Sequence, residues 1–296
     1  MKVTSKFNIQ LEFMLSLYLF ELPSFCKKTD LGLKWRKDVS KKLPTEWKDQ
    51  LKDKELSNTL TWVHSCIHSG YVPGKTVDDL LKWVNQDDDA YRNIDFPKPP
   101  YSMKSVYPFL KTWYDHYFSL LDPLLFEQLH KKQEEVKKII ENQDPQKVIN
   151  NVTKGLLLEN LPDDLEVSLI PQYHARPIVM FHCNERHHAY QYSAEEIIGD
   201  YETLPPIMFR VQRALSDENR LQILKFIESG PQTFKTIHQF IGLAKSTVHH
   251  HLIALRAAGL VNIHVNQGKQ DYYTFREQGL SEMEGRLLAY IKDREE

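Results

Sequence analysis

The stretch AKSTVHHHLIALRAAGLV, residues 244–261, predicts a helix with one buried face and a defined end. Apolar side chains return at the spacing of a single helical face at Val248, Leu252 and Leu255. Gly259 follows this pattern, and glycine is the residue type that most often ends a helix. The helix is therefore predicted to pack through one side and to present the other side to solvent or to a partner.

Three consecutive histidines, His249, His250 and His251, lie within this helix. Consecutive helical residues are about 100° apart around the axis, so the three rings cannot converge on one metal ion. His249 and His250 are predicted to point outward, while His251 lies beside Leu252 on the packed side. We therefore interpret the triplet as two exposed residues and one packed residue rather than as a metal site.

A shorter helix is predicted over residues 233–241, with Thr233 as its N-cap and Gly242 in the turn that follows it. Ala244 occupies the cap position of the next helix and has no side chain that can accept a hydrogen bond. Two helices joined by a tight turn with glycine form a helix-turn-helix, whose second helix enters the major groove of DNA. The pair is therefore predicted to be a DNA-binding element.

The flanking segments complete a winged helix. Residues 217–229 predict a further helix, and Ser216 is its predicted N-cap. Residues 260–265 and 270–275 alternate as two strands joined by a short turn. Helix, helix-turn-helix and hairpin follow one another in the order of a winged helix.

Charge is unevenly distributed along the chain. The 296 residues have a net charge of −2, yet no acidic residue lies between Glu228 and Asp271. Lysine and arginine side chains do occur in this window, at Lys235, Lys245, Arg256 and Lys269. A window of this kind suits a surface that faces phosphates. We expect the last three of these basic residues to contact the DNA backbone.

Two motifs resemble the ArsR/SmtB family of winged-helix transcriptional repressors. ALSDENRLQIL (214–224) is similar to the opening signature of that family, and STVHHHLIALRAAGLV (246–261) is similar to its recognition helix. The resemblance covers about residues 205–291 and implies a homodimer that binds double-stranded DNA. It places the DNA-facing positions on Lys245, Ser246, Thr247, His249 and His250. The last four are the expected base-reading residues, although the family often has serine where His249 stands.

Many members of the family sense metals, through cysteines on the first helix of the helix-turn-helix or through histidine and carboxylate ligands on the last helix. The matching segments here are KTIHQFIGL (235–243), which has no cysteine, and SEMEGRLLAYIKDREE (281–296), which has no histidine. We therefore expect a regulator without the usual metal sites. No cofactor is predicted, and a small-molecule effector is the expected signal.

The remaining sequence predicts a different kind of domain. Residues 1–160 read mainly as helices, and the short runs LEVSLIP (165–171), PIVMFH (177–182) and HHAYQY (187–192) read as strands. GDYETLPP (199–206) is the expected linker. The predicted fold class is mainly α with a small β-sheet (α+β), divided into a helical domain over residues 1–200 and a winged helix over residues 201–296.

One segment outside the winged helix holds several metal-binding residue types. A hairpin in this segment would bring together imidazole and thiol groups of His182, Cys183, His187 and His188, which suit zinc or copper. The spacing matches no established zinc motif, and alternation along a strand sends neighbouring side chains to opposite faces. A structural hairpin is therefore the favoured interpretation, with these four residues as weak metal candidates.

Composition narrows the function classes further. The three cysteines are widely spaced, which favours a reducing, cytoplasmic location. Residues 7–20 are apolar but interrupted by Glu12, so they predict a core-facing amphipathic helix rather than a membrane span. No nucleophile, phosphate-loop or zinc-protease motif is present, so no enzyme is predicted. Two alternatives stay open: a ligand-binding or enzymatic N-terminal domain with a regulatory winged helix, and an interaction module that has lost DNA binding.

Overall fold

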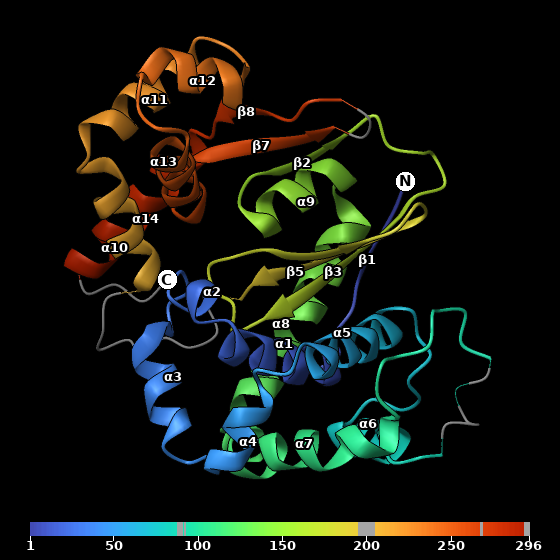
Figure 1. Cartoon of the computed structure of the whole chain (residues 1–296). Coiled ribbons are helices and arrows are strands. Elements are labelled where there is room, and N and C mark those ends of the chain that lie inside the picture. Colours follow the sequence, from blue (N-terminus) through green and yellow to red (C-terminus); the bar gives the residue numbers. More distant parts are fainter. Residues whose placement is uncertain (88–90, 92, 195–204, 267–268, 293–296) are drawn as a thin grey trace.

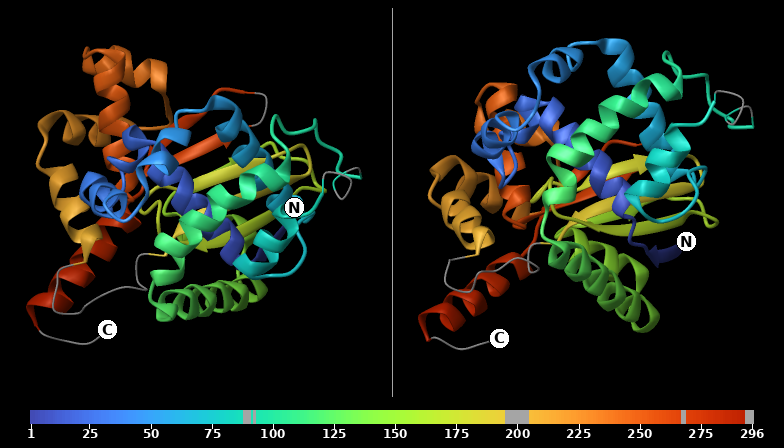
Figure 2. Two further views of the ribbon diagram at one scale, coloured as in Figure 1. Left: turned by 60° about the horizontal axis from the view of Figure 1, so that its bottom comes forward. Right: turned by 90° about the horizontal axis from the view of Figure 1, so that it is seen from below.

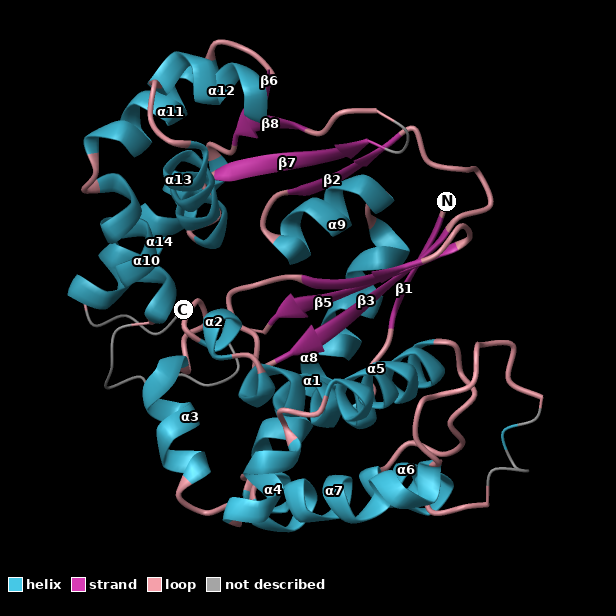
Figure 3. Cartoon of the chain, viewed as in Figure 1, coloured by secondary structure: helices cyan, strands magenta, loops and turns pink. Residues whose placement is uncertain are grey.

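A computed structural model describes residues 1–87, 91, 93–194, 205–266 and 269–292 of the chain (Figure 1). It arranges them in alternating layers of helices and sheets, with the winged helix at one corner (Figure 3). The fold is α+β, as the sequence predicts. Within the described residues, no helix is both long enough and apolar enough to cross a membrane.

The first layer is helical and holds the largest apolar core. Its central helix, α1 (Ile9–Glu21), starts at Asn8, whose side chain accepts a hydrogen bond from the backbone N–H of Gln10. We expected α1 to be amphipathic, but almost all of it is buried, because neighbouring helices and the sheet surround it. The other members are α2 (Pro23–Cys26), α3 (Gly32–Ser40), α4 (Thr45–Gln50), α5 (Lys54–His68), α6 (Val77–Val84), α7 (Met103–His116) and the short 3-10 helix η2 (Phe118–Leu120).

A four-stranded sheet, which we call the central sheet, covers one side of this layer. Its strands lie in the order β1 (Lys2–Ser5), β3 (Glu166–Gln172), β5 (His187–Ser193) and β4 (Met180–Cys183). The first three run parallel and β4 is antiparallel to β5. The predicted strands are therefore present, whereas β1 was not anticipated, because four residues are too few to show an alternating pattern.

Helices α8 (Pro123–Asn142) and α9 (Pro145–Thr153) cover the opposite face of the central sheet (Figures 1 and 2). Alternate residues of the sheet point to this side, including Val167, Leu169 and Tyr190, and pack against Val148 and Ile149 of α9. Both faces of the central sheet are thus covered, which explains why β3 is buried along nearly its whole length.

The winged helix follows from residue 205 onward. Its helices are α10 (Pro206–Leu215), α11 (Glu218–Glu228), α12 (Phe234–Ile241), α13 (Lys245–Ala257) and α14 (Gln278–Ile291). The strands β6 (Gln232–Thr233), β7 (Val261–Asn266) and β8 (Tyr272–Phe275) form the wing. The predicted order of elements is correct, but Asp217 rather than Ser216 caps α11, with its side chain accepting from the N–H of Arg220.

A fourth strand of the wing comes from the first part of the chain. Strand β2 (Leu156–Glu159) pairs in parallel with β7, so that Leu156 lies beside Ile263, and the sheet has the order β2-β7-β8-β6. Sequence analysis did not predict β2, because a four-residue run after a helix carries little pattern of its own. The expected linker at residues 199–206 falls largely outside the described residues, and the division at residue 200 stays a prediction.

Candidate nucleic-acid interface

Helices α12 and α13 form the helix-turn-helix. Thr233 caps α12 by accepting a hydrogen bond from the N–H of Thr236 at 3.2 Å, as predicted. Gly242 ends α12 with a backbone φ of 71°, a left-handed conformation that glycine adopts without strain. The chain then turns into α13 at Ala244, which provides no side-chain cap.

The buried face of α13 fixes its orientation on the domain. Val248, Leu252 and Leu255 are buried in a cluster with residues of α10, α11 and α12. His251 is also buried, and its Nδ1 lies 3.8 Å from Oδ1 of Asp217. Burial lowers the pKa of His251, so the ring is neutral near pH 7.

The outward face of α13 holds the residues expected to contact DNA. All five are exposed at the start of the helix, namely Lys245, Ser246, Thr247, His249 and His250. The ring centroid of His249 lies 6.2 Å from that of Phe234, at the start of α12. The sequence therefore predicted correctly how the histidine triplet divides, with two rings exposed and one packed.

The structure gives Arg256 a different place from the one expected. Its guanidinium points inward and donates to the backbone carbonyl of Thr153 at 3.2 Å and to that of Lys154. Burial lowers its pKa to about 10, and nearby Arg276 adds to the effect. Arg256 follows Leu252 by four residues, so it lies close to the buried face of α13. The sequence prediction gave more weight to its charge than to this spacing. We therefore correct this assignment and exclude Arg256 from the DNA contacts.

Lys269 lies at the end of the wing and is exposed, with its backbone N–H donating to the carbonyl of Asn266 at 3.1 Å. The body of the wing is tied to the first part of the chain by two pairs of asparagines besides the β2–β7 pairing. Asn150 donates to Asn262 at 2.9 Å, and Asn160 donates to Asn266 at 2.7 Å. The wing is thus held by side chains on α9 and after β2, while Lys269 stays exposed.

The four weak metal candidates do not gather into one site. In the register of the hairpin, His182 lies opposite Ala189 and Cys183 lies opposite His188, so alternation sends His182 and Cys183 to different faces. His187 bonds Ser168 Oγ through Nε2 at 2.8 Å. Within the described ranges, no three His, Cys, Asp or Glu side chains are placed to hold a metal ion.

His182 instead joins a histidine cluster that sequence analysis missed. Its ring stacks on that of His68, with centroids 4.6 Å apart, and His64 lies one helical turn before His68 on α5. Burial lowers the pKa of His64 to about 4 and that of His68 to about 2, and the neighbouring histidines contribute to both shifts. The spacing of four residues in HSCIH (64–68) was the available signal.

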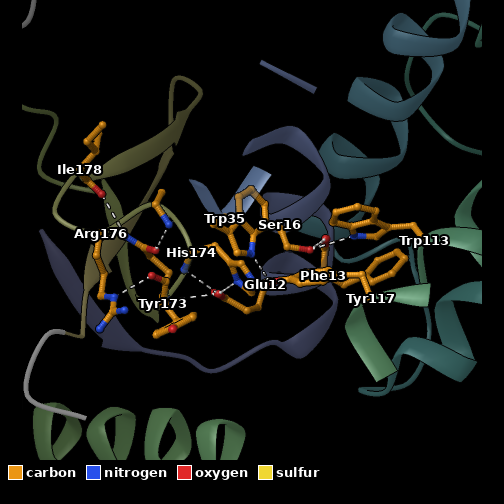
Figure 4. Close-up of polar contacts among 12 residues, drawn as sticks. Glu12, Phe13, Ser16, Trp35, Trp113, Tyr117, Tyr173, His174, Arg176 and Ile178 are labelled. Atoms are coloured by element: carbon orange, nitrogen blue, oxygen red, sulfur yellow. Dashed lines mark hydrogen bonds and ion pairs between the residues drawn. The ribbon is translucent and has the colours of Figure 1, made fainter. Parts of the chain in front are cut away.

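A second polar network lies in the core of the first layer (Figure 4). Trp35 Nε1 donates to the hydroxyl of Tyr117 at 3.0 Å, and that hydroxyl lies 2.7 Å from Nε2 of His174. Burial raises the pKa of Tyr117, so the hydroxyl keeps its proton and donates to Nε2. Nδ1–H of His174 is then left to donate to Glu12 Oε1 at 2.5 Å. The side chains of Glu12 and His174 are 2% and 0% exposed, so this buried network joins α1, α3 and the end of α7 to the segment after β3.

Comparison with known proteins identifies the helix-turn-helix. A family model described as bacterial regulatory protein, arsR family, matches residues 217–262. An ArsR-like transcriptional regulator from Rhodococcus sp. RHA1 is 29% identical over 29% of this chain and 78% of its own, with a TM-score of 0.26. A possible transcriptional regulatory protein (fragment 1–100) from Mycobacterium bovis is 28% identical over 30% of this chain and 92% of its own, with a TM-score of 0.24.

NolR from Sinorhizobium fredii is 22% identical over 31% of this chain and 98% of its own, with a TM-score of 0.24. No curated protein matches the chain. The matched segment begins at Asp217, which caps α11, and ends within β7, so it spans the whole helix-turn-helix. The C-terminal part of this chain therefore carries the helix-turn-helix of the arsR family of bacterial regulatory proteins.

Proposed function

We propose that the protein is a sequence-specific DNA-binding transcriptional regulator of the ArsR type, acting in the cytoplasm as a repressor. The observation that carries this proposal is the exposed start of α13, where polar and basic side chains face outward while the apolar face fixes the helix. A helix presented in this way fits the major groove, which is wide enough to admit it.

The roles of the outward residues follow from their chemistry. Lys245 and Lys269 carry charge and contact phosphates, which contributes affinity without reading sequence. Ser246, Thr247, His249 and His250 can donate and accept hydrogen bonds at base edges. The absence of acidic residues between Glu228 and Asp271 removes repulsion from this surface.

The proposed active form is a homodimer, because two recognition helices about one turn of DNA apart provide the affinity that one short helix lacks. Large apolar side chains are exposed on the first and last helices of the winged helix, namely Phe209 on α10 and Leu288, Tyr290 and Ile291 on α14. Helix α14 projects away from the body of the molecule (Figure 2). An exposed apolar surface of this kind supports its assignment to the contact between two copies.

An effector that binds the first part of the chain would release DNA only if it prefers one arrangement of the recognition helices. Such a preference requires direct structural contacts between the first part of the chain and the winged helix. The pairing of β2 with β7 and the contacts of Arg256 with residues 153 and 154 supply them. The usual cysteine position of the family has no cysteine here, so the proposed signal is not a metal at that site.

Selection of bound duplexes from a random pool, using the purified full-length protein, tests the proposal directly. We expect enrichment of an inverted repeat whose half-sites are centred about one helical turn apart. Enrichment of no sequence, together with binding that does not depend on salt, would contradict DNA recognition. Sedimentation of Ile291→Glu beside the unaltered protein tests the dimer, since a charge in the contact should yield monomers.

A further inference from the structure

A cavity of about 210 Å³ lies between α1, α5, β4 and β5, away from the helix-turn-helix. Its walls are largely apolar and are contributed by Met14, Leu15, Leu17, Leu60, Met180 and Phe181. A cavity of roughly 150 Å³ in another protein accepts benzene, so this volume suits one substituted ring or a short branched chain. The cavity is therefore large enough for a small organic molecule.

One side chain that lines the cavity has a buried polar atom without a partner. The side chain of Gln191 is 2% exposed and lines the cavity from β5. Its Nε2 lies 3.3 Å from Nε2 of His68, whereas its Oε1 has no hydrogen-bond partner among the described residues. A buried acceptor without a donor costs about 1–3 kcal/mol, so a ligand that donates to Oε1 would recover this energy.

The charge of the cavity favours a positive ligand. Glu21, in the last turn of α1, is the one Asp, Glu, Lys or Arg among the lining residues that the structure describes. The C-terminal end of a helix also carries partial negative charge. Burial lowers the pKa values of His64 and His182, so the two histidines in the wall are neutral near pH 7. None of the described lining residues therefore opposes a cation.

Two aromatic rings lie at the open side of the cavity. Phe181 on β4 is 72% exposed, and Tyr18 on α1 is 40% exposed. Exposed aromatic rings of this size lose unfavourable contact with water when a ligand covers them, and their faces attract cations. The opening thus adds both apolar contact and attraction for a positive charge.

We propose that this cavity binds a small apolar amine, with its hydrocarbon part among the apolar walls and its amino group donating to Gln191 Oε1 in the field of Glu21. The site is separate from the DNA-contacting face of α13. It goes beyond the proposed DNA-binding function, and binding of the amine can be measured without DNA.

A matched series of probes tests the chemistry. Calorimetric titration of the full-length protein at pH 7 compares benzylamine, benzyl alcohol and benzoate, which share a ring and differ in charge and donor. Benzylamine is expected to bind most tightly, benzyl alcohol roughly tenfold more weakly, and benzoate more weakly still. No binding of benzylamine at millimolar concentration, or equal binding of benzoate, would overturn the proposal.

Two variants separate the contributions of the polar groups. Glu21→Gln removes the charge at the end of α1 and is expected to weaken benzylamine roughly tenfold while leaving benzyl alcohol unchanged. Gln191→Leu removes the acceptor and is expected to weaken both ligands. If Gln191→Leu fails to fold, Glu21→Gln alone decides, and an unchanged ratio of the two affinities would refute the assignment. Phe240→Ala, an exposed aromatic on α12, is the control and should leave both affinities unchanged.

The histidine cluster calls for one further measurement. Titration with zinc alone is expected to show no site that competes with benzylamine, because the rings of His68 and His182 stack face to face instead of directing nitrogen atoms at a shared point. Tight zinc binding that displaces benzylamine would identify a metal site and overturn the amine assignment. DNA affinity, measured with and without benzylamine, is a separate readout. A failure of the DNA-binding proposal can therefore be told apart from a failure of the amine-binding proposal.

Discussion

Oε1 of Glu159 on β2 lies 2.7 Å from Nδ1 of His264 on β7, and the hydroxyl of Tyr272 on β8 donates to the same oxygen at 2.5 Å. One carboxylate from the first part of the chain thus joins both strands of the wing hairpin. The Tyr272 hydroxyl and His264 lower the pKa of Glu159, and the contact raises the pKa of Tyr272 to about 12. The wing is consequently anchored by side chains as well as by the pairing of β2 with β7.

Substitution of Glu159 tests this anchor. Glu159→Gln is expected to lower the free energy of unfolding by about 1–2 kcal/mol at pH 7, because the two hydrogen bonds to Oε1 lose the negative charge that strengthens them. A carboxyl group whose pKa is lowered by folding stabilises the folded chain at pH values above its pKa in the unfolded chain. This stabilisation is lost as pH falls through the pKa in the folded chain, so the difference in unfolding free energy between the variant and the unaltered protein should shrink below about pH 4. Urea unfolding at both pH values measures it. Glu166→Gln, which breaks only the surface pair with Lys2, is the control and should change little.

Two substitutions on α13 separate phosphate contact from base reading. Lys245→Ala is expected to weaken binding to selected and random duplexes alike and to reduce the salt slope by about 0.9, as loss of one phosphate contact requires. His250→Ala is expected to weaken binding to the selected duplex more than to the random one. Fluorescence anisotropy over a range of salt concentrations provides both values. Lys52→Ala, on the helical side of the molecule, is the control, and an equal loss in that variant would refute both roles.

Arg256 provides a contrasting case on the same helix. Arg256→Ala is expected to lower the free energy of unfolding by about 2–3 kcal/mol, because the carbonyls of Thr153 and Lys154 lose a charged donor in a buried place. The salt slope of DNA binding by Arg256→Ala, measured under conditions in which this variant is still folded, should stay unchanged. A reduced slope without a stability loss would restore Arg256 to the phosphate contacts. Arg186→Ala, a highly exposed arginine, serves as the matched control.

The half-buried histidines of α5 predict how stability depends on pH. In the folded chain the pKa of His64 is lowered to about 4 and that of His68 to about 2. The ordinary pKa of histidine is about 6.5, so below that pH the unfolded chain binds protons that the folded chain does not. Stability should therefore be unaffected above pH 7 and fall as pH decreases from 6.5 to 4, with a slope of at most about 1.4 kcal/mol per pH unit for each histidine. His64→Phe should flatten this slope. An unchanged slope in that variant would contradict the assignment.

The missing cap of α13 predicts a stabilising substitution. Ala244→Ser supplies a side-chain acceptor for the first turn and is expected to raise the free energy of unfolding by about 1 kcal/mol. Thermal unfolding followed by circular dichroism measures the gain. Thr233→Ala is the reciprocal control, because it removes the cap that α12 already has and should lower stability by a similar amount. A destabilised Ala244→Ser variant would show that the backbone at this turn does not suit a capping side chain.

Local sequence patterns are enough to predict the winged helix and the outward row of α13. These features depend on local chemistry: the spacing of Val248, Leu252 and Leu255, the glycines after α12 and α13, and the threonine before α12. Each of these acts within a few residues of its own position, so one stretch of sequence contains all the necessary information. The division of the histidine triplet belongs to the same class, because helical geometry alone sets the angle between consecutive rings.

Contacts between distant segments, in contrast, depend on how the whole chain packs. The pairing of β2 with β7 joins residues more than a hundred positions apart, and no pattern within LLLE (156–159) specifies its partner. The inward turn of Arg256 likewise depends on carbonyls at residues 153 and 154, and the cavity near Gln191 depends on α1 and α5 packing on β4 and β5. The physical reason is that burial and unpaired polar atoms are properties of packed surfaces, which a single segment does not contain.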